Sequence, residues 1–307
     1  MKFFLSSTYD DLVEHREKAA NAIARLEQQV VRMEVFGARP VEATEVCAQE
    51  IKSCDAIIGI YAHRYGYVPE GSQISITEQE FLLAQSEGKL IFAFLVADDF
   101  PWRPSFIEHE PGITRLKEFK KRISSTLVRD TFSTPDDLAY KISATLGRFL
   151  ISTKVKEQLE KIPQSAIVTT PNGRSQVARR AERLHSIFKN ARILLVNDTP
   201  QQMQHVVTLL KGLLIDVEVV TSTEDALKAL ERRKFDLSIS DMRRGSTFDA
   251  GIQFLNEALR RGMALPTIFT VGAYEPGKGV PPFAFGITNR IDELLNLVFD
   301  VLERTRG

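Results

Sequence analysis

Short apolar segments alternate with amphipathic segments along most of this chain, and this alternation limits the possible folds more than any other feature. The first half is predicted to contain strands at residues 2–7, 30–36, 56–61, 90–96 and 125–132. Helices are predicted at residues 10–28, 41–54, 115–122 and 136–149, with a further short helix around Glu80. Strands that are apolar throughout and are separated by helices are typical of a parallel sheet covered on both faces. The sequence therefore predicts an α/β fold with a doubly wound parallel sheet.

A second series of the same kind begins at Arg192. Its strands are predicted at residues 193–196, 216–220, 237–240, 267–271 and 283–287. Between the two series, residues 162–175 carry two prolines and a glycine and have little helical periodicity. An Arg-rich amphipathic helix is predicted at residues 175–190, packed on one domain or used for dimerisation.

We therefore expect two doubly wound domains. The first covers residues 1–152 and the second covers residues 191–307, with a linker and connecting helix at residues 153–190. A chain of 307 residues is long enough for two domains of ordinary size.

The balance of charges excludes the usual electrostatic argument for nucleic acid or an anionic membrane as partner. The chain has 40 basic and 40 acidic residues, so its formal net charge is zero. No apolar run approaches the length of a bilayer span, and Met1 leads directly into a strand. We expect a cytoplasmic protein. Cys47 and Cys54 are expected to be reduced, because on one helix their Cα atoms would lie about 10 Å apart.

The segment from Ser75 to Phe94 carries the sharpest functional signal. It places Glu78 and Glu80 in the first turns of a short helix that leads into a buried strand. A carboxylate there lies at the rim of a parallel sheet, where small ligands usually bind. The alternative is that both acids are surface residues that interact favourably with the helix dipole.

Several polar residues follow the first three strands and are candidates for holding a nucleotide. Hydroxyl and backbone N–H groups before a helix can receive a pyrophosphate, arginines can pair with phosphate, and either Tyr65 or Trp102 can stack on a ring. The residues so assigned are Ser6, Ser7, Thr8, Tyr9, Arg39, Arg64 and Tyr65. The alternative for the first three is simple capping of the following helix.

The first half resembles a family of uncharacterised Toll/interleukin-1-receptor-like (TIR-like) domains. The motifs that carry the resemblance are Phe4-Leu5-Ser6-Ser7-Thr8-Tyr9, Arg64-Tyr65-Gly66-Tyr67-Val68-Pro69 and Ser75-Ile76-Thr77-Glu78-Gln79-Glu80-Phe81. Some TIR domains cleave the nicotinamide–ribose bond of NAD+ with a glutamate on the helix after the third strand. The resemblance matches Glu80 to that residue, or Glu78 if the register slips. It also implies self-association and a role in stress, immune or anti-phage defence.

Two other functions remain open for the first half. One is a non-enzymatic scaffold that uses a TIR-like surface for homotypic contacts. The other is an enzyme similar to the nucleoside deoxyribosyltransferases, whose folds share a glutamate at the strand rim. The scaffold would not need Glu80, whereas the transferase would exchange bases on deoxynucleosides and ignore NAD+.

The second half resembles the receiver domains of response regulators from about residue 191 to 305. Asn197 and Asp198 match the acidic pair of that family, and Asp241 matches the phosphoacceptor. Asp198 and Asp241 could together hold one Mg2+, since hard cations prefer carboxylate oxygens. The position of the family's switch hydroxyl would fall at Val271 or, with a slip of register, at Thr270.

The second half also departs from the receiver pattern. The first acid is the amide Asn197, and the lysine expected near the end of the fifth strand is missing from residues 286–290. That lysine would contact the phosphoryl oxygens. We therefore interpret this half as a degenerate receiver that binds a ligand or signalling partner and regulates the first domain. A working phosphorelay is the alternative.

Overall fold

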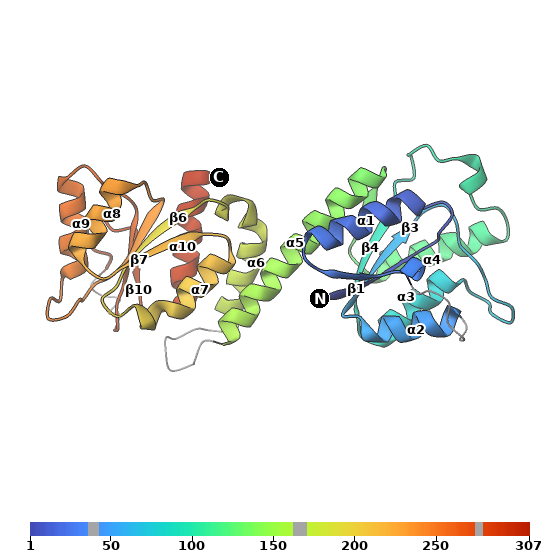
Figure 1. Cartoon of the computed structure of the whole chain (residues 1–307), viewed down its shortest axis with the longest axis horizontal. Helices are drawn as coiled ribbons and strands as arrows, with labels where there is room; N and C mark the ends of the chain where they lie inside the picture. The colour runs from blue at the N-terminus through green and yellow to red at the C-terminus, as the bar shows by residue number, and fades with distance from the viewer. Residues whose placement is uncertain (36–42, 162–170, 274–278) are drawn as a thin grey trace. The chain divides into compact units, whose positions relative to one another are not determined.

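The computed structural model describes residues 1–35, 43–161, 171–273 and 279–307. The chain divides into two compact units, Met1–Gly147 and Arg148–Gly307, and each is a sheet flanked by helices (Figure 1). Helix α5 (Pro135–Glu160) begins in the first unit and its C-terminal half belongs to the second. The predicted end of this helix at residue 149 is wrong, because Val155 and Leu159 continue its apolar face and are buried in the core of the second unit.

Five parallel strands form the first sheet, in the order β2-β1-β3-β4-β5. The strands are β1 (Lys2–Ser7), β2 (Gln29–Val31), β3 (Ala56–Tyr61), β4 (Leu90–Val96) and β5 (Arg129–Phe132). Strand order reverses at β1, because β2 lies on one side of it and β3 on the other. Strands β1 and β3 are parallel and pair from Phe3 with Ala56 to Ser7 with Ile60. Ligands in open α/β sheets usually bind beyond the carboxyl ends of the strands at such a point. The predicted doubly wound fold is confirmed.

Helices cover both faces of the first sheet. They are α1 (Val13–Arg25), α2 (Ala43–Ser53), α3 (Ile76–Ser86), α4 (Gly112–Thr126) and α5. Apolar residues of α1 and α5 share a core with Phe3 and Leu5 of β1. Residues of α2 and α3 pack around Phe4 on the other face, where α4 also packs. This division into two faces decides which side chains can share a site.

Five parallel strands also form the second sheet, in the order β10-β9-β8-β6-β7. They are β6 (Arg192–Val196), β7 (Asp216–Val220), β8 (Leu237–Asp241), β9 (Thr267–Thr270) and β10 (Gly286–Thr288). The helices are α6 (Pro171–Phe188), α7 (Gln204–Gly212), α8 (Thr223–Arg232), α9 (Ala250–Arg260) and α10 (Ile291–Arg306). Leu194 and Val196 face α8 and α9, whereas Ile193 and Leu195 face α7 and α10.

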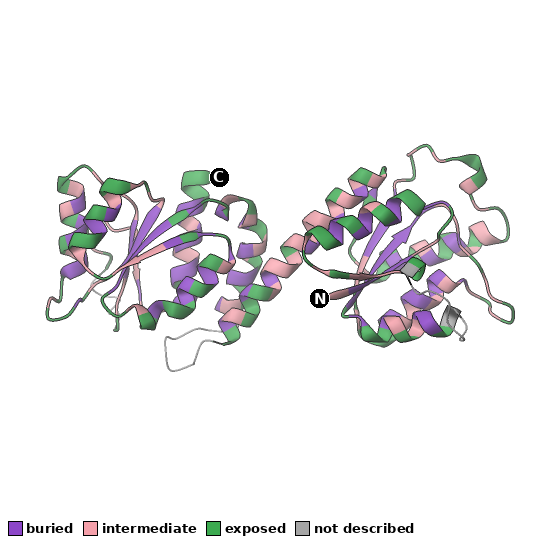
Figure 2. Cartoon of the chain, in the orientation of Figure 1, coloured by how far each residue is buried: buried purple, intermediate pink, exposed green. Residues whose placement is uncertain are grey.

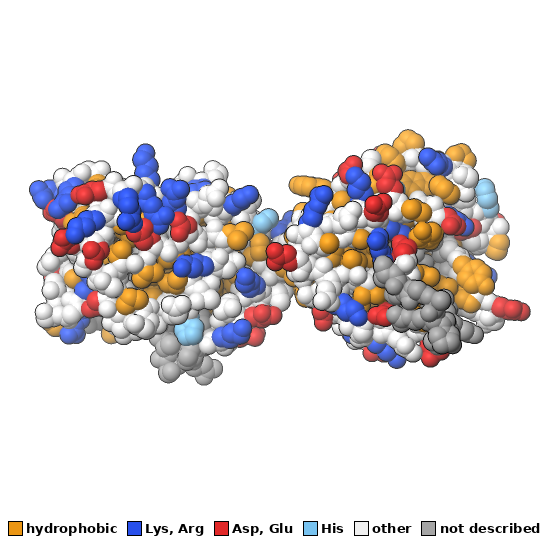
Figure 3. Space-filling view, in the orientation of Figure 1, with side chains coloured by type: hydrophobic (Ala, Val, Ile, Leu, Met, Phe, Trp, Pro, Cys, Tyr) orange, Lys and Arg blue, Asp and Glu red, His pale blue; other side chains and the backbone are white. Residues whose placement is uncertain are grey.

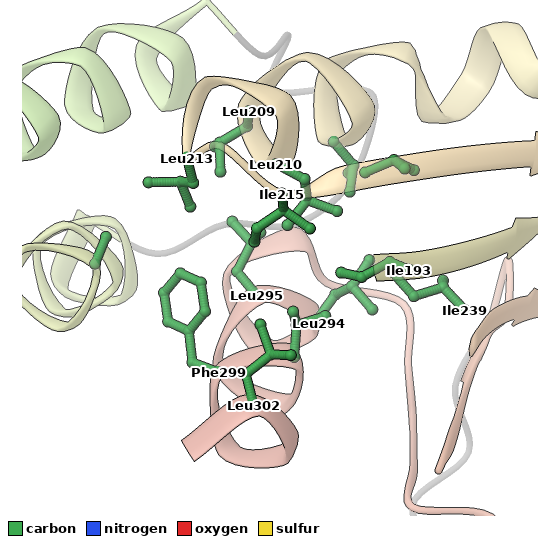
Figure 4. Packing of buried hydrophobic residues seen from close by; sticks show 14 of the residues in the cluster. Ile193, Leu209, Leu210, Leu213, Ile215, Ile239, Leu294, Leu295, Phe299 and Leu302 are labelled. Carbon is green, nitrogen blue, oxygen red and sulfur yellow. The ribbon is translucent and has the colours of Figure 1, made fainter. Parts of the chain in front are cut away.

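Helix α6 packs on α10 within the second unit. Phe188 lies 4.9 Å from Phe299 between ring centroids, and Arg180 donates to Asp300 at 2.7 Å. Figure 4 shows the core beneath this helix pair, where leucines of α10 face the end of α7 and the strand residues Ile193 and Ile239. The central strands of both sheets are buried almost throughout (Figure 2).

Three predicted strands are shorter in the structure. Strand β2 stops at Val31, because only three of its residues pair with β1 at this sheet edge. Strand β5 begins at Arg129, because Ser124, Ser125 and Thr126 donate to carbonyls of α4 and so extend that helix. Strand β10 begins at Gly286, because Phe283 has a positive φ of 65° and is 77% exposed.

Acidic and basic side chains are interspersed on the visible face of each unit (Figure 3). In the described ranges, no helix is both long enough and apolar enough to span a bilayer. Cys47 and Cys54 are both buried and free, as predicted.

Candidate functional site

Glu80 lies beneath the carboxyl end of β1 because α3 is fixed there by its N-cap. The hydroxyl of Ser75 accepts a hydrogen bond from the backbone N–H of Glu78 at 3.3 Å and so starts the helix. One turn later the Glu80 side chain points at the sheet, where the Ser6 hydroxyl donates to Glu80 Oε2 at 2.6 Å. Glu80 is only 5% exposed. The structure therefore brings together two of the predicted site residues that are 74 positions apart.

The surroundings of Glu80 favour its protonated form. Burial raises the pKa of Glu80 from 4.5 to about 7, although the Ser6 hydroxyl, the Cys47 thiol and the charge of Arg16 act in the opposite direction. Burial and the neighbouring Glu80 also raise the pKa of the Cys47 thiol to about 12, so this cysteine is an unreactive thiol at neutral pH. Glu80 and Cys47 line a cavity of about 170 Å³ between α2 and α3.

Glu78 occupies a separate network on the other side of α3. The Tyr65 hydroxyl donates to Glu78 Oε2 at 2.6 Å, and Arg122 of α4 forms an ion pair with Glu78 Oε1. The same hydroxyl accepts from the backbone N–H of Ser75 at 3.3 Å. Tyr65, predicted to stack on a ring, is therefore bonded through its hydroxyl to α3, and its ring is buried.

Two more of the predicted residues near the end of β1, Ser7 and Tyr9, lie against a buried arginine. Arg16 of α1 is 3% exposed, donates to Ser7 Oγ at 2.7 Å, and contacts both oxygens of Glu34 at 2.7 and 2.6 Å. Its guanidinium carbon lies 5.9 Å from the ring centre of Tyr9, which is 53% exposed. Glu34 lies in the 3-10 helix at Met33–Val35, so the acid that pairs with Arg16 comes from beyond β2 and not from α1.

The other two predicted arginines are not brought together with Glu80 in the described part of the chain. Arg64 forms an ion pair with Asp10 at 3.0 Å, on the outer side of the loop after β3. Arg39 lies outside the described residues. The side chains of Ser6 to Thr8 do not cap α1, which begins at Val13 with Leu12 as its N-cap residue and without a side-chain cap.

The second unit places its acids at the carboxyl end of the second sheet. Asp241 ends β8, and burial together with the charge of Asp198 raises its pKa. Asp198 Oδ2 accepts from the backbone N–H of Gly245 at 2.6 Å. Thr270 is the ladder partner of Asp241 and ends β9.

Two features of this end of the sheet differ from a cation-binding site of three acids. Asn197 is 4% exposed, and its side-chain oxygen accepts from the backbone N–H of Thr199 at 2.7 Å. Arg290, near the missing lysine position, pairs with Asp292 at 2.6 Å. Over the ranges that the structure describes, no group of three or more metal-ligating acid, His or Cys residues is present. Mg2+ at Asp198 and Asp241 would therefore have only these two carboxylates from the described residues.

Arg244 was missed by the sequence analysis, although it organises this edge. It is 8% exposed and donates to Ser240 Oγ at 2.8 Å, to Thr223 Oγ1 at 2.7 Å and to the carbonyl of Ala250 at 2.6 Å. Burial lowers its pKa, and Asp241 and Asp198 oppose that shift. An arginine three residues after a strand gives no signal of burial, so only the fold could reveal this role.

Comparison with known proteins finds a family and a set of similar folds. A family model described as "Domain of unknown function (DUF4062)" matches residues 2–147, slightly less than half of the 307-residue chain. No curated protein matches the chain.

Solved structures similar to the chain include response regulators and receiver domains. The chemotaxis response regulator CheY4 of Vibrio cholerae is 21% identical, with a TM-score of 0.33, over 37% of this chain and 99% of that chain. The response regulator TrrA of Thermotoga maritima, solved with Mg2+ and BeF, is 20% identical, with a TM-score of 0.32, over 36% of this chain and 98% of that chain. A signal receiver domain from Pseudomonas fluorescens is 21% identical, with a TM-score of 0.34, over 38% of this chain and 97% of that chain.

Proposed function

We propose that the first unit is a TIR-like domain that cleaves the nicotinamide–ribose bond of NAD+, with Glu80 as its catalytic carboxylate. The observation that carries this proposal is the position of Glu80, which is buried, bonded to Ser6 at the carboxyl end of a central strand, and adjacent to a cavity. A carboxyl group whose pKa is raised to about 7 is typical of functional sites. The resemblance of the three N-terminal motifs to TIR-like domains points to the same residue.

The chemistry needs one carboxylate. Water adds to C1′ of the ribose while the bond from C1′ to the pyridine nitrogen breaks, which gives ADP-ribose, nicotinamide and one proton. Nicotinamide takes the bonding electrons and leaves as a neutral molecule, so no acid has to protonate it. Positive charge develops on the ribose, and an ionised Glu80 stabilises it or holds the ribose hydroxyls.

The substrate itself favours the active protonation state. Burial disfavours ionised Glu80, whereas the cationic nicotinamide ring next to it favours the ionised form. In the free enzyme, kcat/KM should therefore rise as the pH increases through about 7. Activity that falls over the same range would contradict a role for the ionised carboxylate.

The size of the cavity limits what it holds. At about 170 Å³ it is smaller than a typical ligand pocket of about 300–1,000 Å³, so we assign it the nicotinamide riboside end alone. The phosphates would lie beyond β1, near Ser7, Thr8 and Tyr9. Arg64 would exchange Asp10 for a phosphate, and Arg39 remains a predicted phosphate ligand.

The second unit is proposed to be a degenerate receiver that senses a ligand or signalling partner and controls self-association of the first. On this proposal the TIR-like domain covers residues 1–152 and the receiver-like domain covers residues 191–307, with residues 153–190 connecting them. Support comes from Asn197, whose side-chain oxygen accepts a hydrogen bond from the backbone N–H of Thr199, and from Arg290, which forms an ion pair with Asp292. Both features make a phosphorylated Asp241 less stable than in a receiver with a full acidic pair and a lysine.

The test is nicotinamide release from NAD+ by the full chain at high protein concentration with a crowding agent. Glu80→Gln keeps the shape and removes the charge, and Glu78→Gln is the matched control on the opposite side of the same helix. We expect release by the wild type and by Glu78→Gln, with a loss of at least about a hundredfold in Glu80→Gln.

The other outcomes distinguish the alternative functions of the first unit. Equal release by wild type and Glu80→Gln would refute the assignment of Glu80. No release by any protein, with self-association that survives Glu80→Gln, would favour the scaffold. Exchange of free bases on deoxynucleosides without NAD+ cleavage would favour the transferase.

A further inference from the structure

A second and larger cavity lies in the first unit, away from Glu80. It has a volume of about 320 Å³ and is enclosed by the start of α1 and by the loop at residues 101–106 after β4. Trp102, in its wall, packs against the core formed by α1, α5 and Phe3. The cavity of Glu80 lies instead with Cys47 and Ile51, on the face that carries α2 and α3. The two cavities are therefore on opposite faces of the sheet.

Buried polar atoms without a partner are concentrated around this larger cavity. Asp11 and His15 line it, are 7% and 8% exposed, and have no hydrogen-bond partner for either carboxylate oxygen or for Nε2 among the described residues. The same holds for Trp102 Nε1, so the three lining residues Asp11, His15 and Trp102 supply four of the eight such atoms in the described ranges. Two more, His63 Nε2 and Thr8 Oγ1, belong to residues outside the lining. More than about 90% of buried polar groups in proteins have a partner, and an unmade bond costs about 1–3 kcal/mol.

Interactions within the protein do not account for this arrangement. Asp11 lies just before α1, and burial raises its pKa. The Thr8 hydroxyl, the backbone N–H of Asp11 and the charge of Arg64 act in the opposite direction, but neither the hydroxyl nor the N–H forms a well-aligned hydrogen bond with the carboxylate. The ring of Trp102 contacts both histidines, with its centroid 5.4 Å from that of His15 and 5.5 Å from that of His63. A shared metal ion is not indicated, since these residues form no ligating group of three in the part of the chain that the structure describes.

The lining specifies the chemistry of an occupant. A carboxylate with two free oxygens accepts two parallel N–H bonds, and an indole N–H can only donate. Trp102, Phe106 and Pro101 provide flat apolar walls. The rim carries Asp10 and Glu14 against a single arginine, Arg103, which disfavours a phosphate or carboxylate. The volume lies at the lower end of the range of ligand pockets, which suits a single heterocycle or a nucleoside.

We propose that this cavity binds a planar, phosphate-free nitrogen heterocycle or aromatic amidinium that donates two adjacent N–H groups to Asp11. The ring would lie against Trp102, whose N–H would meet an acceptor atom of the ligand, and His15 Nε2 would complete the polar contacts. A 2-amino-6-oxopurine nucleoside and an aromatic amidinium both carry this paired-donor edge. The site is independent of the proposed NAD+ cleavage at Glu80.

The chain provides its own reporter for the test. Trp102 is the only tryptophan of the 307 residues, so its fluorescence in the full-length protein reports directly on this cavity. Guanosine and benzamidine represent the two ligand sources, and inosine is the control that lacks the 2-amino donor. We expect a saturable change in Trp102 emission with guanosine, benzamidine or both, and an affinity for inosine at least about tenfold weaker than for guanosine if guanosine binds.

Two variants that each remove one negative charge distinguish direct contact with the ligand from a general effect of charge on binding. Asp11→Asn replaces one of the two acceptor oxygens by an N–H₂ donor and should weaken binding by at least about tenfold. Asp10→Asn removes the charge of a rim residue whose side chain is 70% exposed and should weaken binding by less than about threefold. If Asp11→Asn does not fold, His15→Leu tests the same cavity from α1 and should also weaken binding.

Two results would overturn the proposal. The first is the absence of any change in Trp102 emission and of any calorimetric heat with guanosine and benzamidine up to about 1 mM. The second is binding that persists unchanged in a folded Asp11→Asn variant. Binding of guanosine alone assigns the purine source, and binding of benzamidine alone assigns the amidinium source.

Discussion

Replacing Glu80 by glutamine should stabilise the first unit at neutral and alkaline pH, and the effect should vanish in acid. In the unfolded chain the pKa of Glu80 is about 4.5, whereas burial raises it to about 7 in the folded protein. Between these values the folded state retains a proton that the unfolded state has lost. The free energy of unfolding therefore falls as the pH rises through this window.

The size of the effect follows from the two pKa values. Each pH unit between 4.5 and 7 costs about 1.4 kcal/mol, so the full window costs about 3 kcal/mol. Glutamine has nearly the same shape and carries no charge at any pH. The difference in free energy of unfolding between Glu80→Gln and wild type should therefore grow from about zero near pH 4.5 to about 3 kcal/mol above pH 7.

Urea unfolding at several pH values, followed by Trp102 emission, measures this difference. Because Trp102 is the only tryptophan, the signal reports the first unit without contribution from the second. All other titrating groups are shared by the two proteins and cancel in the comparison. A difference that stays constant from pH 4.5 to 8 would show that burial does not perturb Glu80 as described, and would remove the physical basis for its proposed role.

Three further changes test the contacts around the two sheets. Tyr65→Phe removes the hydroxyl that donates to the buried Glu78 at 2.6 Å, and urea unfolding should show a loss of about 1–3 kcal/mol; an unchanged midpoint would mean that the bond is not formed in solution. Arg16→Lys cannot reproduce the two hydrogen bonds that Arg16 donates to the two oxygens of Glu34, so we expect the free energy of unfolding to fall by about 2–4 kcal/mol in the same assay. An unchanged free energy of unfolding would contradict the buried pair. Millimolar Mg2+ should raise the midpoint of thermal unfolding of the second unit, measured by circular dichroism. The reason is that a bound cation would offset the repulsion between the carboxylates of Asp198 and Asp241 at the end of β8. A rise of equal size in Asp198→Asn would show that the ion binds elsewhere.

The fold was predictable because its signals are local. The alternation of apolar strands and amphipathic helices was sufficient to predict two doubly wound sheets, since each element is specified by the periodicity of its own residues. The errors occurred where neighbours decide the outcome. Strand β5 is short because Ser124 and its neighbours bond back onto α4, and α5 is long because Val155 and Leu159 find a core in the second unit.

The candidate site was only partly predictable for the same reason. The sequence placed Glu78 and Glu80 on one helix near the sheet rim, but it did not determine which of them faces the sheet. Packing of α3 against β1 turns Glu80 toward Ser6, and packing against α4 leaves Glu78 to Tyr65 and Arg122. Two residues apart on a helix, the acids point in different directions, and the neighbouring elements then decide the role of each.

The element types, the two-sheet architecture and the shortlist of carboxylates follow from the amino-acid sequence alone, because they depend on spacing along the chain. Which polar groups are buried together depends on how the elements pack in three dimensions. Asp11, His15 and Trp102 carry no motif, yet strand order brings the loop after β4 against the start of α1 and leaves their polar atoms unpaired beside a cavity. Desolvation and hydrogen bonding depend on distance in space, and residues nearly a hundred positions apart acquire them only when the sheet has formed.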